Sequence, residues 1–129
     1  MKLLLLALFF GTASATVFTA NVKGTVICHK RKQSGILVEF KEADAVSKDD
    51  LMGTATTDTD GFFEISGKND EWGGIEPYVY IYHNCRTIKE GCLTRSRYEY
   101  PQYAVNGVYD MSYIALDIAT ADESSVKCQ

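Results

Sequence analysis

The 129-residue sequence lacks an excess of positive charge, and its formal net charge at pH 7 is −4. General nucleic-acid binding needs a basic surface, because contacts with phosphates draw their free energy from the release of counterions. The sequence also lacks internal repeats, low-complexity tracts and linker-like segments. These absences argue against a nucleic-acid-binding protein and against a repeat array. They leave a chain of suitable length for one domain with one hydrophobic core.

Long apolar runs are absent except near the start of the chain. The run LLLLALFF, residues 3–10, precedes Ala13 and Ala15, whose spacing is the one that a signal peptidase accepts. A membrane-spanning helix needs about 20 apolar residues, which is far more than this run supplies. We therefore expect residues 1–15 to be a secretory signal peptide and residues 16–129 to be one extracellular domain. No segment is expected to span a membrane.

The sequence has four cysteines but no CxxC pair. In an exported protein, four cysteines predict two disulfides. Three pairings are possible, and we favour Cys85 with Cys92, because the short loop between them is easily closed. Elimination then pairs Cys28 with Cys128. The missing CxxC pair and the oxidising compartment argue against a zinc site built from these thiols and the two histidines. We expect neither a metal nor another cofactor.

Apolar and polar residues alternate along most of the chain, which predicts strands rather than helices. Seven segments carry this pattern: residues 22–28, 36–42, 51–57, 61–67, 77–83, 93–100 and 109–118. The first two flank the charged turn HKRKQSG and are expected to pair as antiparallel strands. Only DAVSKDDL and KNDEW have a composition suited to a helical turn. The pattern predicts an all-β sandwich of about seven strands in two sheets, with little helix.

The stretch TDTDG, residues 57–61, contains two aspartates in the manner of a calcium-binding loop. A calcium loop between two helices needs a bidentate carboxylate at its twelfth position. With Gly61 as the sixth residue, the twelfth is Gly67, which has no carboxylate. β-branched and aromatic residues flank the stretch. We therefore predict a hairpin corner between two strands, with Asp60 and Gly61 in turn conformations.

Four pieces, VKGTVIC, ILVEFKEAD, DLMGTATTDTDGFFEISG and EPYVYIYHNC, occur in an order that resembles the transthyretin-like family of nematode secreted proteins. The resemblance extends from about Val22 to Cys128, and the four cysteines, the TDTDG turn and YHNC carry it as a set. It implies a transthyretin-type β-sandwich, secretion and extracellular recognition rather than catalysis. Among the roles attributed to the family is recognition of phosphatidylserine on dying cells, which bridges them to a phagocyte receptor.

The resemblance also brings in a related enzyme branch, which hydrolyses 5-hydroxyisourate. Those enzymes combine a histidine near the mature N-terminus, a central arginine and histidine, and a C-terminal Tyr-Arg-Gly-Ser. The tail SYIALDIATADESSVKCQ lacks this tetrad. Neither His29 nor His83 stands in a recognisable nucleophile or base arrangement. We therefore expect no enzyme. The alternative binding role is that of a carrier for a small hydrophobic ligand, hormone-like or lipid-like, and the oligomeric state stays open.

Basic residues gather in two places on this acidic chain and are the candidate ligand-binding residues. They are Lys30, Arg31 and Lys32 in the first turn, Arg86 and Lys89 in a later loop, and Arg95 and Arg97 in the following strand. Two arginines on one strand face, roughly 7 Å apart, are able to grip neighbouring phosphate or carboxylate groups. Pairing with Glu99 or a cross-strand acid is the alternative. The expected partner is an anionic phospholipid or a cell-surface receptor.

Five tyrosines crowd the C-terminal third of the chain: Tyr98, Tyr100, Tyr103, Tyr109 and Tyr113. A tyrosine buries its ring while its hydroxyl stays hydrated, which suits contact with a protein or a lipid interface. Core and strand-edge positions are the alternative for these residues.

Overall fold

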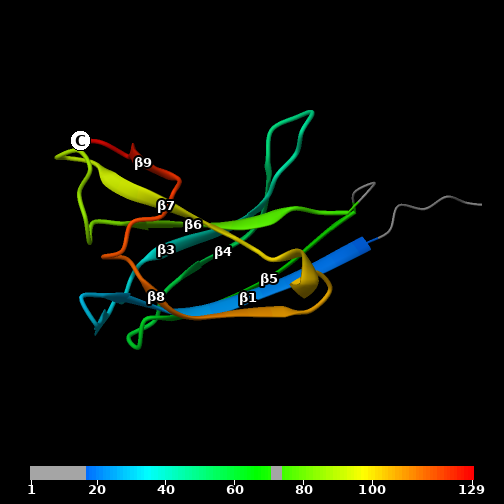
Figure 1. Cartoon of the computed structure of the whole chain (residues 1–129), viewed down its shortest axis with the longest axis horizontal. Coiled ribbons are helices and arrows are strands. Elements are labelled where there is room, and N and C mark those ends of the chain that lie inside the picture. Colours follow the sequence, from blue (N-terminus) through cyan, green and yellow to red (C-terminus); the bar gives the residue numbers. More distant parts are fainter. Residues whose placement is uncertain (1–16, 71–73) are drawn as a thin grey trace, which may run out of the picture.

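The computed structural model describes residues 17–70 and 74–129. The expected signal peptide, residues 1–15, lies outside the described residues. The described chain forms two β-sheets and a single 3-10 turn at Gln102–Ala104, which confirms the expected all-β sandwich (Figure 1). Within the described ranges, no helix is long and apolar enough to cross a membrane.

The four-stranded sheet is built around one long strand. Its members are β1 (Val17–Cys28), β2 (Arg31–Lys32), β5 (Phe62–Asp70) and β8 (Val108–Ala115). Strand β5 pairs antiparallel with most of β1, and β2 pairs with its last two residues. Strand β8 lies parallel to β1 on the other side. Strand β8 is therefore at one edge of this sheet.

The five-stranded sheet has the order β4-β3-β6-β7-β9, with antiparallel neighbours throughout. Its members are β3 (Leu37–Glu42), β4 (Asp50–Thr56), β6 (Pro77–His83), β7 (Leu93–Glu99) and β9 (Glu123–Val126). Strand β6 lies at the centre, and both of its faces are covered. This position follows from its sequence, because valine and isoleucine face the core while tyrosines face outward.

The expected pairing of residues 22–28 with residues 36–42 is wrong. His29 and Lys30 both have positive φ, of 48° and 69°, so they close a two-residue hairpin between β1 and β2. The chain then leaves the four-stranded sheet, and β3 pairs with β4 and β6 in the other sheet. The tight turn contains His29 and Lys30, and β2 contains Arg31 and Lys32. A hairpin between residues 22–28 and 36–42 would need these residues for its connecting loop.

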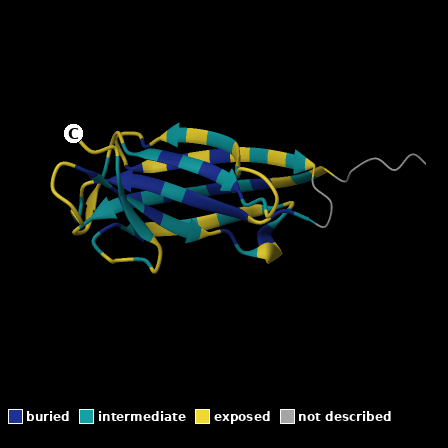
Figure 2. Cartoon of the chain, turned by 90° about the horizontal axis from the view of Figure 1, so that it is seen from above, coloured by how far each residue is buried: buried dark blue, intermediate teal, exposed yellow. Residues whose placement is uncertain are grey.

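The inner faces of the two sheets meet in one hydrophobic core. Its fully or almost fully buried side chains include Val22, Val26, Val38, Phe40, Phe63, Val79, Ile81 and Leu116. Buried and less buried residues alternate along the strands, as Figure 2 shows. The alternation that predicted the strands is thus the alternation between core and outer surface.

The TDTDG stretch turns as predicted, but the expected hairpin is wrong, because β4 and β5 belong to different sheets. The Asp58 side chain accepts hydrogen bonds from the backbone N–H groups of Asp60 and Phe62, at 2.8 and 3.0 Å. Gly61 has φ 75°, and a Cβ atom there would lie 2.7 Å from the Val26 carbonyl oxygen. Only glycine therefore fits this corner without strain. The corner joins β4 in one sheet to β5 in the other, and so closes one side of the sandwich.

The two expected disulfides are present, but the expected pairing is wrong. Cys28 is bonded to Cys85, and Cys92 is bonded to Cys128. The first bridge joins the ends of β1 and β6 across the two sheets. The second follows from the antiparallel register of β7 and β9, which pairs Leu93 with Val126 and brings the flanking cysteines together. Spacing along the sequence does not reveal either proximity.

Candidate functional site

Three tyrosines form a ladder on the outer face of the five-stranded sheet. Tyr78, Tyr80 and Tyr82 alternate along β6 with core residues. The rings of Tyr78 and Tyr80 meet edge to face, with centroids 5.0 Å apart, and those of Tyr80 and Tyr82 meet likewise at 6.3 Å. Edge-to-face packing is a favourable arrangement of aromatic quadrupoles. Tyr78 and Tyr82 are buried, at 1% and 9% exposed, and Tyr80 is partly buried, so the ladder is an ordered row of rings that neighbouring side chains largely cover.

Arg95 and Arg97 lie beside this ladder on β7. The register of β6 and β7 pairs Arg95 with Tyr82 and Arg97 with Tyr80, so both arginines share the outer face, as their spacing predicts. The Arg95 guanidinium carbon lies 4.2 Å from the ring centroid of Tyr80. That of Arg97 lies 3.7 Å from the ring centroid of Tyr78. Both distances are within the range of cation–π attraction, which holds the guanidinium groups against the sheet.

Two lysines that the sequence reasoning missed complete the row of cations. The Lys41 ammonium is 5.6 Å from the Tyr80 centroid, and the Lys127 ammonium is 5.4 Å from the Tyr82 centroid. Strand β3 carries Lys41, and Lys127 directly follows β9. The tyrosine face, as we name it, consists of the three rings and these four cations: Tyr78, Tyr80, Tyr82, Lys41, Arg95, Arg97 and Lys127.

Carboxylates hold the outer rings of the ladder in place. The Tyr78 hydroxyl donates to Asp49 at 2.5 Å, and the Tyr82 hydroxyl donates to Glu39 at 2.6 Å. Burial, with the Glu39 hydrogen bond, raises the pKa of Tyr82 to about 12. The hydrogen bond from Tyr78 lowers the pKa of the Asp49 carboxyl. Both phenols therefore stay neutral donors at physiological pH, and the Asp49 carboxyl stays charged.

The cations of the tyrosine face differ in how far they are already neutralised. Arg97 donates to Glu99 at 2.7 Å, which is the pairing that the sequence left open as the alternative. Within residues 17–70 and 74–129, the ion pairs do not include Arg95, Lys41 or Lys127. These three side chains are therefore the ones available to an anionic ligand.

The other basic candidates do not join this face. Arg86 forms an ion pair with Glu123 and donates through Nε to a backbone oxygen, so its guanidinium holds the fold together. Lys89 is exposed in the loop between β6 and β7. The remaining three, Lys30, Arg31 and Lys32, are exposed at the β1–β2 turn of the other sheet. The structure thus separates the candidates that the sequence grouped by charge.

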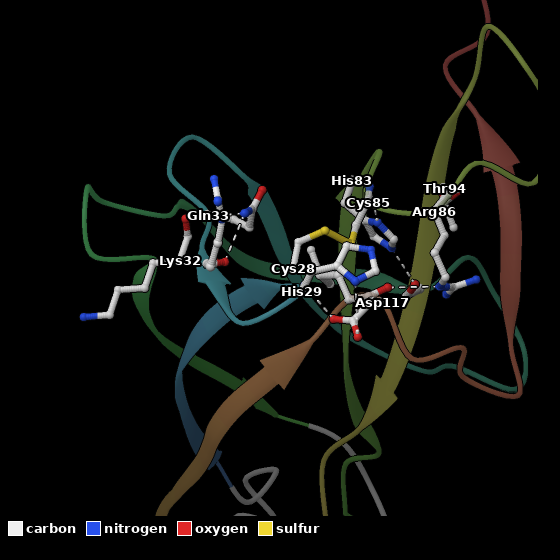
Figure 3. Close-up of a disulfide and its surroundings, with 12 residues drawn as sticks. Cys28, His29, Lys32, Gln33, His83, Cys85, Arg86, Thr94 and Asp117 are labelled. Atoms are coloured by element: carbon white, nitrogen blue, oxygen red, sulfur yellow. Dashed lines mark hydrogen bonds and ion pairs between the residues drawn. A yellow bond between two sulfur atoms is a disulfide. The ribbon is translucent and has the colours of Figure 1, made fainter.

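A chain of buried polar groups lies next to the first disulfide (Figure 3). The Cys85 N–H donates to His83 Nδ1 at 3.2 Å, so the ring proton must be on Nε2, which lies 2.9 Å from the Ser96 hydroxyl. Ser96 in turn donates to Glu123 at 2.7 Å. Burial lowers the pKa of His83. Because Ser96 is fully buried, this chain does not offer a nucleophile to a substrate.

The sulfur atoms of Cys28 and Cys85 and a ring nitrogen of His29 lie within 4.8 Å of one another. Both sulfurs are consumed by the disulfide, so neither supplies the thiolate that binds a transition metal. The Asp117 carboxylate instead accepts the backbone N–H of His29 at 2.9 Å and secures the turn after β1 (Figure 3). The three residues therefore form a structural disulfide beside a hydrogen-bonded turn.

The five C-terminal tyrosines separate into core and surface positions. Tyr100 is buried, and its hydroxyl donates to the Ala104 carbonyl at 2.6 Å. Tyr98 and Tyr109 are partly buried. Tyr103 and Tyr113 are 85% and 67% exposed. The cluster is therefore no continuous contact surface.

In a comparison with known protein families, residues 23–101 match the sequence model of the Transthyretin-like family. The curated Transthyretin-like protein 16 of Caenorhabditis elegans is 37% identical over 126 residues, which cover 98% of this chain and 95% of that protein. Transthyretin-like protein 5 of the same organism is 32% identical, and the alignment covers 90% of this chain and 91% of that protein. Both alignments include nearly the whole chain.

Among solved structures, the crystal structure of a 9R-lipoxygenase from Cyanothece PCC8801 matches with a TM-score of 0.52. The identity is 14%, and the match covers 84% of this chain but only 18% of the lipoxygenase chain. The likeness therefore concerns the fold of one part of that enzyme.

Proposed function

The chain belongs to the transthyretin-like family, and from this premise we propose that it is a secreted binding protein for anionic phospholipid headgroups, phosphatidylserine among them. The tyrosine face is its binding surface. One observation carries the proposal: four cations are stacked along three ordered rings, on a chain with a formal net charge of −4. Such a local concentration of positive charge directs anions to one face of an otherwise acidic molecule.

The chemistry of this face suits a membrane interface. Arginine binds phosphate and carboxylate oxygens in a bidentate manner, and phosphatidylserine offers both groups. The tyrosine rings lie beneath the cations, with Tyr78 and Tyr82 only 1% and 9% exposed, so they support the cations and leave the contact with the headgroups to them. Cations held against the rings are partly ordered before the ligand arrives, which reduces the entropy lost on binding.

The expected affinity of one molecule is weak. Each basic side chain near an anionic surface contributes about 1 kcal/mol, so the three cations without an ion-pair partner give about 3 kcal/mol, which corresponds to a Kd of about 6 mM. The neighbouring carboxylates of Glu39, Asp49 and Glu99 reduce this further. Useful attachment then needs several copies on one surface, or a receptor that binds the protein while it sits on the lipid. We propose that a protein receptor binds a face other than the tyrosine face, so that the chain bridges the two.

Vesicle sedimentation tests the proposal. Vesicles of phosphatidylcholine with about a third phosphatidylserine should retain the protein, and pure phosphatidylcholine vesicles should not. The bound fraction should fall as salt is raised from about 50 to 500 mM, because screening shortens the reach of each charge. The double variant Lys41→Gln with Arg95→Gln removes two cations that have no ion-pair partner among the described residues, and should lower the bound fraction at least fivefold.

The matched control removes the same charge elsewhere. Lys30→Gln with Lys32→Gln changes two exposed lysines at the β1–β2 turn, and should leave vesicle binding within about twofold of the unaltered protein. Equal losses in both variants would indicate non-specific charge attraction. Unchanged binding in the Lys41 and Arg95 variant, with its thermal midpoint intact, would remove the tyrosine face from the proposal.

A further inference from the structure

One carboxylate beside the tyrosine face keeps an oxygen atom without a donor. Strand β3 carries Glu39, whose Oε1 accepts a hydrogen bond from the Tyr82 hydroxyl at 2.6 Å. Among residues 17–70 and 74–129, no donor forms a hydrogen bond with its Oε2 and no cation forms an ion pair with it. The hydrogen bond from Tyr82 orients this half-buried side chain. Glu39 is thus an ordered acceptor with room for one more donor.

The two other carboxylates of this face have both oxygens engaged. One oxygen of Asp49 accepts from the Tyr78 hydroxyl, and the other accepts from a backbone N–H at 3.0 Å. Both oxygens of Glu99 accept from Arg97, at 2.7 and 3.5 Å. A donor from a ligand would have to displace one of these hydrogen bonds. Glu39 is therefore the carboxylate of this face that is best placed to bind a ligand.

Two cations without an ion-pair partner among the described residues lie next to Glu39. The register of β3 and β6 pairs Glu39 with Tyr80. The Arg95 guanidinium carbon and the Lys41 ammonium lie 4.2 and 5.6 Å from the centroid of the Tyr80 ring. Arg95 also opposes the rise in the pKa of Tyr82, so its guanidinium lies close to the hydroxyl that donates to Glu39. One carboxylate and two cations thus gather around one ring.

We infer that this mixed-charge cluster, Glu39, Lys41 and Arg95, selects a serine headgroup: Glu39 binds the ammonium, and the two cations bind the carboxylate and the phosphate. The inference rests on the proposed function and deepens it. The headgroup carries two anionic groups and one cation, and the cluster carries two cations and one anion. A face of cations alone would repel the ammonium, and so would bind phosphatidylglycerol, which has the same net charge but no ammonium, at least as well. Glu39 reverses that preference.

Charge-matched vesicles test this role of Glu39. Vesicles of phosphatidylcholine contain about a third of either phosphatidylserine or phosphatidylglycerol, and sedimentation at about 100 mM salt gives the affinity for each. The unaltered protein should bind the phosphatidylserine vesicles about threefold to fivefold more tightly, as expected for one partly exposed ion pair. Glu39→Gln keeps an acceptor for the Tyr82 hydroxyl but removes the charge. It should bind phosphatidylglycerol more tightly than the unaltered protein does and phosphatidylserine no more tightly, so that the ratio of affinities falls to about one.

Glu99→Gln is the matched control on the same face. This substitution removes an equal charge and releases Arg97 from its ion pair, but leaves the Glu39 carboxylate in place. Both kinds of vesicle should therefore be bound more tightly by the same factor, and the ratio of affinities should not change. Tyr82→Phe removes the hydrogen bond that orients Glu39, and should lower the ratio without removing any charge.

The outcomes distinguish this inference from the proposed function. If the unaltered protein binds neither kind of anionic vesicle, the proposed function is overturned, and the selection of serine with it. If it binds both kinds equally, or if Glu39→Gln gains the same affinity for both, only the role of Glu39 is overturned. Circular dichroism and the thermal midpoint of each variant establish that it is folded.

Discussion

Replacement of Glu123 by glutamine tests whether the buried polar chain stabilises the sandwich. The carboxylate accepts hydrogen bonds from Arg86, from the Ser96 hydroxyl and from the backbone N–H of Thr120. Its side chain is only 9% exposed. These contacts hold three elements together: strand β7, strand β9 and the loop that follows β6. Glutamine keeps the size of the side chain but removes its charge, so the substitution isolates the charge-assisted part of the contacts.

The expected loss is about 2–3 kcal/mol of the free energy of unfolding. A hydrogen bond to a charged group contributes about 1.5–3 kcal/mol, and breaking a fully buried ion pair costs about 3–5 kcal/mol. The lower range applies here, because the Arg86 side chain is 27% exposed and is able to regain water. For a domain of this size, the thermal midpoint should fall by about 10 °C or more, measured by calorimetry at pH 7.

Glu99→Gln is the matched control for this prediction. Glu99 also pairs with an arginine, but its side chain is 71% exposed, and exposed pairs contribute little. The thermal midpoint of Glu99→Gln should differ from that of the unaltered protein by less than about 3 °C. Equal shifts in the two variants would refute the reasoning that burial, rather than the presence of an ion pair, decides the effect.

The pH dependence of Glu123→Gln gives a second readout. Burial raises the pKa of Glu123, but the hydrogen bonds from Arg86 and Ser96 outweigh it and leave the pKa below its ordinary value of 4.5. The carboxylate therefore stabilises the fold above pH 4.5, and this contribution is lost as the pH falls toward the lower pKa of the folded state. The stability difference between the unaltered protein and Glu123→Gln should narrow below pH 4.5. A constant difference down to pH 3 contradicts the assignment.

Three further predictions follow from local features. Burial lowers the pKa of His83 from 6.5, so as the pH falls the unfolded chain protonates this histidine before the folded chain does. The free energy of unfolding, measured in urea, should therefore fall below pH 6.5. The fall should be smaller in His83→Gln. Gly61 has φ 75°, and a Cβ atom there would lie 2.7 Å from a carbonyl oxygen, so Gly61→Ala should lower the free energy of unfolding by about 2–3 kcal/mol. Gly35→Ala shares that φ but meets nothing within 4 Å and should cost about 1 kcal/mol in the same denaturation series; equal costs would exclude the steric explanation. Non-reducing peptide mapping should join Cys28 to Cys85, and replacing both by serine should cost about 4 kcal/mol, because the bridge closes a loop of 57 residues. A fragment that joins Cys28 to Cys128 would contradict this connectivity.

The strands were predictable where alternation was strong. In β6, valine and isoleucine alternate with tyrosine, and the structure buries the aliphatic residues in the core. Strand β2 has two residues, and β9 is the polar run ESSV, so neither carries a periodic pattern for the sequence to reveal. Strand β1 begins at Val17, five residues before the expected start, because the long partner β5 extends its pairing that far.

The candidate site was predictable only in part. Arg95 and Arg97 share a face because side chains two residues apart in a strand point the same way. Lys41 and Lys127 join them through the pairing of β3 with β6 and of β7 with β9, which local pattern does not specify. Arg86 has the same charge as the others, but its partner Glu123 lies 37 residues away in sequence. Charge alone does not distinguish a ligand-binding arginine from a structural one.

The sequence by itself determined the all-β class, the corner at Asp58 to Gly61 and the division of each strong strand into a core side and an outer side. These depend on residues a few positions apart, whose effects on backbone conformation and burial are local. The tertiary structure decided which strands are neighbours, which cysteines are bonded, and which cations lie over the tyrosines of β6. Those features depend on contacts between residues far apart in the chain, and such contacts are selected by the packing of the whole core.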